Sequence, residues 1–165
     1  MDTFVEQIVA IKRTGKTWAA YLGIAVVAVL LMTVVTIAVG SLFIVFDALI
    51  LFGAYKLYSM LSVEYEYIIT NSTMDIDKII AKSSRKRVVS FDLSAVLRIE
   101  KYTGIIPKEV ENNCFFACNK NDDNAYILIY KIEGKPQQAF VFAPDEKMIS
   151  GMKNFLPRHI CENLK

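Results

Sequence analysis

The chain has 165 residues, of which 54% are hydrophobic, and its 19 Lys and Arg residues nearly balance 17 Asp and Glu residues. The net charge of +2 excludes the strongly basic composition that is typical of nucleic-acid-binding domains. One histidine and three cysteines without a CxxC pair (Cys114, Cys118 and Cys161) argue against a zinc site, so we expect no metal and no cofactor. We expect the cysteines to be free thiols in a reducing cytosol; the alternative is a structural disulfide.

Residues 1–17 have the pattern of an amphipathic leader beside a membrane. Thr3 begins an S/T-x-x-E capping box, and Phe4, Ile8 and Ile11 recur at helical spacing. We therefore predict a short juxtamembrane helix in the headgroup region. The alternative is a polar leader without fixed structure.

Residues 18–61 are almost all apolar, with an interruption at Gly40-Ser41. A single helix of this length would extend about 66 Å, roughly twice the apolar thickness of a bilayer. Two helices of about 20 residues each would match that thickness. The segment therefore predicts a transmembrane helical hairpin with its turn near residues 40–41.

Aromatic and basic residues flank the apolar segment in a way that predicts its orientation. The aromatic residues expected at the membrane interfaces are Trp18, Tyr21, Tyr55, Tyr58, Tyr65 and Tyr67. Lys12, Arg13 and Lys16 precede the first span and Lys56 lies near the end of the second, whereas the turn has no basic residue. The positive-inside rule then predicts a multi-pass protein of the cell membrane with both termini in the cytoplasm.

Asp47 is a carboxylate inside the second predicted span. Folding the chain at Gly40 brings it level with Thr33 and Thr36, whose hydroxyls are suitable hydrogen-bond donors. We interpret these intramembrane polar residues as a contact between the helices. The functional alternative is a proton or ion site.

From residue 62 the hydrophobic period changes to two, which predicts strands in a separate cytoplasmic domain, residues 62–165. The predicted strands are 63–70, 74–80, 88–91, 96–102, 114–118, 125–132 and 138–142. A final helix follows Pro144, and Met148, Met152 and Phe155 form an apolar stripe that we expect to face the core. We expect this domain to fold without the hairpin.

About seven short strands followed by one amphipathic helix resemble the pleckstrin-homology (PH) fold. Residues 64–70, the turn, residues 74–80 and the basic loop resemble the opening of bacterial PH-like domains, in which two closely spaced membrane helices often precede the domain. The resemblance implies a membrane-anchored α+β protein of the bacterial cytoplasmic membrane, with a helical hairpin followed by an antiparallel barrel or sandwich and a C-terminal helix. Residues 103–124 match no part of this pattern. The family implies no established activity.

The basic loop supplies the candidate binding residues, because no catalytic motif such as G-x-S-x-G, H-E-x-x-H or a P-loop occurs. Lys82, Arg85, Lys86 and Arg87 form the densest basic cluster, and we expect them to contact anionic lipid headgroups. The alternative is a solvated hairpin tip.

These observations predict a non-enzymatic integral membrane protein whose PH-like domain binds at the inner membrane surface. The alternative is a protein-interaction or scaffold subunit of a membrane complex, which would hold a peptide at its sheet edge or in a helix groove. Small residues such as Ala28 and Gly53 would permit close helix contacts in an oligomer.

Overall fold

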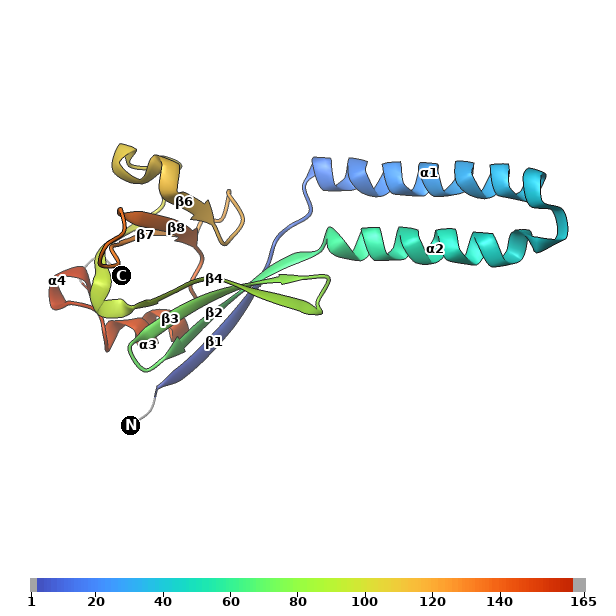
Figure 1. Cartoon of the computed structure of the whole chain (residues 1–165). Helices are drawn as coiled ribbons and strands as arrows, with labels where there is room; N and C mark the ends of the chain where they lie inside the picture. The colour runs from blue at the N-terminus through green and yellow to red at the C-terminus, as the bar shows by residue number, and fades with distance from the viewer. Residues whose placement is uncertain (1–2, 162–165) are drawn as a thin grey trace. The chain divides into compact units, whose positions relative to one another are not determined.

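The computed structural model describes residues 3–161 and contains two compact units, which Figure 1 shows in the chain's colour order. The β unit consists of residues up to 11, residues 64–79 and residues from 85 onward. The helical unit consists of residues 12–63 and 80–84. In sequence, the helices therefore interrupt the β unit after its first strand. Residues 1–2 and 162–165, which belong to the predicted leader and domain, lie outside the described residues.

The helical unit contains α1 (Gly15–Val39) and α2 (Phe43–Met60), which run antiparallel and pack against each other (Figure 1). The 3₁₀ turn η1 (Gly40–Leu42) joins them at the predicted position. Gly40 has a φ of 62°, a left-handed conformation that glycine adopts without a Cβ clash. Taken together, Gly15–Met60 is one apolar helical stretch of 46 residues, long enough to cross a membrane.

Strand β1 (Phe4–Ala10) shows that the predicted leader helix is wrong. It pairs antiparallel with β2 (Val63–Thr70), in a register that runs from Phe4 opposite Thr70 to Ala10 opposite Glu64. Its side chains alternate between exposed and half-buried, which is the period of a strand. The strand forms because β2 supplies partners for its backbone groups, and this pairing outweighs the local capping box at Thr3.

Two four-stranded sheets form the β unit, with the orders β1-β2-β3-β4 and β5-β7-β8-β6. The remaining strands are β3 (Thr73–Ile80), β4 (Ser84–Asp92), β5 (Val96–Lys101), β6 (Cys114–Phe116), β7 (Tyr126–Tyr130) and β8 (Gln138–Phe142). The second sheet is antiparallel except that β6 lies parallel to β8. The predicted antiparallel barrel or sandwich did not include this parallel pair.

The main core lies between the sheets and α3 (Glu146–Lys153). Met148 and Met152 are fully buried in it, which confirms that this helix faces the core. The Asp145 side chain accepts a hydrogen bond from the Met148 N–H at 2.7 Å and caps the helix. Phe155 lies beyond the end of α3 and is only half-buried, so the predicted stripe has two helical members. A short helix, α4 (Arg158–Cys161), follows.

Residues 103–124, which match no part of the PH-like pattern, supply the edge strand of the second sheet and cover one face of that sheet. They contain the 3₁₀ helix η3 (Lys108–Asn113) and β6. Val110 and Cys118 pack with Ile127 and Ile129 of β7 in a second apolar cluster. Every residue of β7 is consequently buried, which explains its continuous apolar sequence.

Candidate functional site

The predicted basic loop is mostly strand, and its two arginines are paired with carboxylates of the same sheet. The Arg85 Nη1 atom lies 3.0 Å from the Glu66 Oε2 atom. The Arg87 Nη1 atom lies 2.7 Å from Asp75 Oδ2, and its Nε atom donates to Asp77 Oδ1 at 2.8 Å. These arginines therefore balance acidic groups of β2 and β3 and are not two unpaired charges at a hairpin tip.

The two lysines of the predicted cluster are placed differently from the arginines. Lys82 lies in the tight turn between β3 and β4 with a φ of 55°, and it belongs to the helical unit. Lys86 is exposed on β4. The structure thus does not gather all four predicted basic residues into one binding site.

Glu66 is the most unusual ionisable group of this region because its side chain is completely buried. Burial raises the pKa of its carboxyl, and the neighbouring Glu6 carboxyl raises it further, while Arg85 lowers it. Neither Glu66 oxygen accepts a well-directed hydrogen bond from the described residues. Loss of solvation is therefore the dominant influence, and the ion pair with Arg85 offsets it only in part.

The three polar residues that the sequence predicts to lie within the membrane line one hollow of about 400 Å³ between α1 and α2, namely Thr33, Thr36 and Asp47. The predicted hydrogen bonds between them are wrong, however. The hydroxyls donate within their own helix, from Thr33 to the Val29 carbonyl and from Thr36 to the Met32 carbonyl, each at 2.9 Å. Threonine satisfies its hydroxyl this way in helix interiors. The Asp47 Oδ1 atom is buried and has no hydrogen-bond partner among the described residues.

Aromatic residues gather where α1 begins and α2 ends. The Tyr21 and Tyr58 rings lie 4.3 Å apart between centroids, and Trp18 meets Tyr21 edge-on at 6.0 Å. Tyr67, which the sequence placed at a membrane interface, is instead fully buried in the β unit. Its hydroxyl donates to the Ala117 carbonyl at 2.7 Å, and burial raises its pKa.

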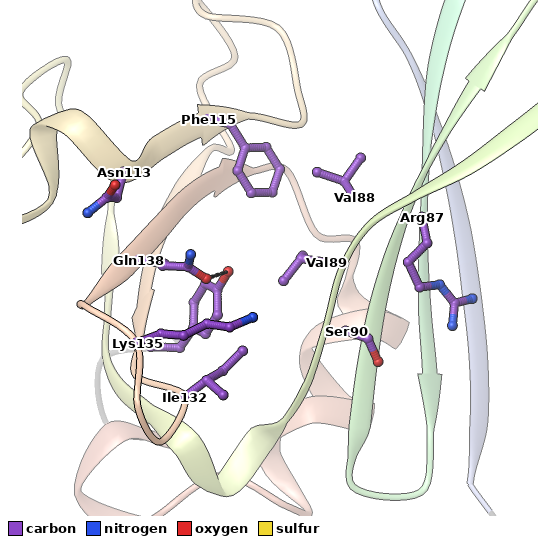
Figure 2. A pocket seen from close by; sticks show the side chains of 10 residues that line it. Arg87, Val88, Val89, Ser90, Asn113, Phe115, Ile132, Lys135 and Gln138 are labelled. Carbon is purple, nitrogen blue, oxygen red and sulfur yellow. Dashed lines mark hydrogen bonds between the residues drawn. The ribbon is translucent and has the colours of Figure 1, made fainter.

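A cleft of about 360 Å³ opens in the β unit between β4 and the second sheet, as Figure 2 shows. Val88, Val89 and Phe115 give it an apolar side, and the Lys135 side chain extends into it (Figure 2). Arg87 points away from the cleft in the same view, which agrees with its ion pairs.

Two polar residues inside the cleft are hydrogen-bonded to each other. The Tyr130 hydroxyl donates to the Gln138 Oε1 atom at 2.9 Å (Figure 2), and burial raises the pKa of Tyr130 to about 12. Tyr130 is therefore a neutral hydrogen-bonding group at physiological pH. Sequence reasoning missed this cleft because its residues come from four separated segments with no shared motif.

The described residues offer no metal-binding cluster of His, Cys, Asp and Glu side chains. All three cysteines are free thiols, and burial raises the pKa of Cys118 to about 12. This thiol is therefore a poor nucleophile at neutral pH.

Comparison with known proteins identifies the family but adds no relative. The family model described as "Bacterial PH-like domain (DUF6106)" matches residues 1–162. Searches of the curated proteins and of the solved structures give no significant match. The match includes β1 and both helices as well as the strands that follow them. The chain therefore belongs to the DUF6106 family of bacterial PH-like domains.

Proposed function

We propose that this protein is a non-enzymatic membrane anchor whose two helices cross the bacterial cytoplasmic membrane and hold the PH-like β unit at its inner surface. The supporting observation is the apolar surface of the helices. Within α1 only Tyr21 and Ala28 are buried, and no residue of α2 is. Ile37, for example, is 81% exposed. Such surfaces are stable in hydrocarbon and not in water.

The pairing of β1 with β2 supports two crossings. These strands flank the helices in sequence and are hydrogen-bonded neighbours in one sheet. Both ends of the helical segment must therefore lie on the same side of a membrane, which requires an even number of crossings. The basic residues beside these ends, Lys12, Arg13, Lys16 and Lys56, favour the cytoplasmic side.

Cysteine labelling of intact cells tests this topology. A reporter in Ser41→Cys should react with a membrane-impermeant maleimide, because the turn faces outward. A reporter in Ile105→Cys, which replaces an exposed side chain of the β unit, should react only after the cells are opened. The parent protein measures the background from its three native thiols. Labelling of Ile105→Cys in intact cells would contradict the proposed orientation.

We also propose that β4 contacts anionic lipids through Lys86, which is exposed, since Arg85 and Arg87 are held by carboxylates. Each basic residue near an anionic membrane surface contributes about 1 kcal/mol to the free energy of membrane binding. In nanodiscs, amine labelling of Lys86 should be slower with phosphatidylglycerol present than with phosphatidylcholine alone. Lys147, an exposed lysine of α3, serves as the internal control. Equal protection of Lys86 in the two lipids would contradict this contact.

A second candidate function, protein interaction, is favoured by the cleft of Figure 2. β4 is an edge strand of the first sheet, and Val88–Ser90 borders the cleft. An edge strand beside an apolar cleft can add an extended peptide of a partner protein. Affinity purification from native membranes tests this: one stoichiometric partner, lost in a Val89→Lys variant, would favour the scaffold function.

A further inference from the structure

We infer that the beginning of α1 and the groove between α1 and α2 form a binding site for one anionic phospholipid, with its phosphate at Arg13 and an acyl chain in the groove. The inference rests on the proposed insertion of these helices in a bilayer. All residues of the site belong to the helical unit.

Three aromatic rings hold the Arg13 guanidinium in place. Its Cζ atom lies 5.1 Å from the centroid of the Tyr21 ring and 5.9 Å from those of Trp18 and Tyr58. Cation–π contacts of this kind leave the edge of the guanidinium, with its N–H donors, open to an acceptor. Because Tyr21 is on α1 and Tyr58 is on α2, both helices fix the position of this charge.

Arg13 differs from the paired arginines of the β unit. Arg85, Arg87 and Arg98 each lie within ion-pair distance of a carboxylate. Among residues 3–161, no carboxylate or carbonyl accepts a hydrogen bond from Arg13. A guanidinium binds phosphate oxygens through two parallel N–H bonds, so Arg13 is suited to an external phosphate group.

The Tyr21 hydroxyl and the first N–H groups of α1 are further donors at the same end of the helix. Tyr21 is 7% exposed, and its hydroxyl is buried without a hydrogen-bond partner among the described residues. Helical side chains lean toward the N-terminus, so the phenol covers the turn that precedes it. α1 has 25 residues, and it begins without a side-chain cap at Thr14 and without an acidic residue in its first turn. Its first N–H groups and its dipole therefore favour an anion at the same end.

The groove beside these rings identifies the anion as a lipid headgroup and not free phosphate. An apolar groove of about 450 Å³ lies between α1 and α2, and Ala20 and Leu57 line it. These two residues are the chain neighbours of Tyr21 and Tyr58, so one end of the groove lies at the same level along the helices as the aromatic rings. Gly23 and Gly53 also line it, and a Cβ atom added at either would meet no atom within 4 Å. The groove thus has the width and the chemistry for an acyl chain that continues from a phosphate at Arg13.

Native mass spectrometry of the full-length protein in mild detergent tests the inference. Phosphatidylglycerol and phosphatidylcholine with identical acyl chains are added in equal amounts, so that the two lipids differ only in their headgroups, one anionic and one zwitterionic. We expect the protein to retain phosphatidylglycerol preferentially. Arg13→Gln should reduce this preference about tenfold or more, since a charged hydrogen-bonding group is lost. Lys147→Gln, which also removes one positive charge from an exposed side chain of α3, is the matched control and should not change it.

Two more variants separate the headgroup from the groove. Tyr21→Phe keeps the ring and removes the hydroxyl, so it should lower phosphatidylglycerol affinity about threefold to tenfold. Gly53→Leu should fill the groove and lower the retention of both lipids equally. Both variants keep Arg13, so they test the site even if Arg13→Gln does not fold.

Several outcomes would overturn the assignment. Equal lipid preference in the parent protein, Arg13→Gln and Tyr21→Phe would show that Arg13 only clamps the helices. Displacement of the lipid by inorganic phosphate would assign the site to a soluble anion. A dimer without lipid that Gly53→Leu dissociates would assign the groove to a second copy of the chain. Release of the protein from membranes by alkaline carbonate would instead contradict the proposed insertion itself.

Discussion

At the scale of single residues, the charged side chains of the first sheet form ion pairs with one another, so they are not all available to a ligand. Glu66 is fully buried, and Arg85 lies beside it. Arg87 bridges two aspartates of β3. The sequence showed four basic residues in a row of six and predicted a binding loop. It could not show that acidic residues, ten or more positions earlier, would take two of those charges.

We predict that Glu66→Gln reduces the pH dependence of stability. The pKa of Glu66 is raised in the folded state, so the folded protein binds more protons than the unfolded chain between the ordinary glutamate pKa and the raised value. Stability should therefore be greatest below the ordinary value and fall as the pH rises through the raised one. Glutamine lacks this ionisation and should remove the fall.

Thermal unfolding of the full-length protein in detergent, followed by circular dichroism across this pH range, measures the effect. Glu111→Gln replaces an exposed carboxylate of η3 and should retain the pH dependence of the parent protein. Parallel pH curves for the parent and Glu66→Gln would show that folding does not raise the pKa of the Glu66 carboxyl.

At the scale of elements, prediction succeeded where a strand alternates in sequence and its pairing partner is the next strand along the chain. β2 and β3 alternate in sequence and are joined by a tight turn at Asn71, whose φ is 53°. β1 failed because its seven residues fit both a helical and a strand period, and its partner lies about 60 positions away. β6 falls within the predicted strand 114–118, but η3 was not predicted, since the local signals before it are turn residues and its Val110 packs against β7.

The position of β1 changes the expectation that residues 62–165 fold alone. Without β1 the edge of β2 and the face of α3 lose their neighbour, and Gln7 no longer bonds the Ala143 carbonyl. We predict that a 62–165 fragment shows no cooperative unfolding. A fusion of residues 1–11 through a short Gly-Ser linker to residues 63–165 should unfold cooperatively in urea. Equal stability of the two proteins would show that β1 is dispensable.

Gly151 of α3 provides a direct test of the packing between α3 and β1. A Cβ atom at this position would lie 2.9 Å from the Val5 Cγ2 atom. Gly151→Ala should therefore destabilise the β unit by about 1–3 kcal/mol, despite the better helix propensity of alanine. Val5→Ala in the same chain should restore part of the loss, which thermal unfolding of single and double variants can measure. Additive losses would indicate that the two residues do not touch.

At the scale of the whole molecule, a single family model matches both the helices and the strands. The sequence predicted a hairpin followed by a domain, whereas the structure has a domain whose first strand precedes the helices. Composition located the apolar segment because a long run of apolar residues can be recognised without knowing which other segment it contacts. The order of assembly was not visible, because only the β1–β2 register shows that the two ends of that segment meet.

That register also sets an order of events during synthesis. β1 leaves the ribosome first, but its partner follows only after both helices have been made. Under the proposed topology, a chain that inserted a single helix would leave β1 and β2 on opposite sides of the membrane, and the sheet would remain open at β2. Closure of the first sheet would then serve as a check on correct insertion. Chains with one failed crossing would present an unpaired strand to the proteases that remove misfolded membrane proteins.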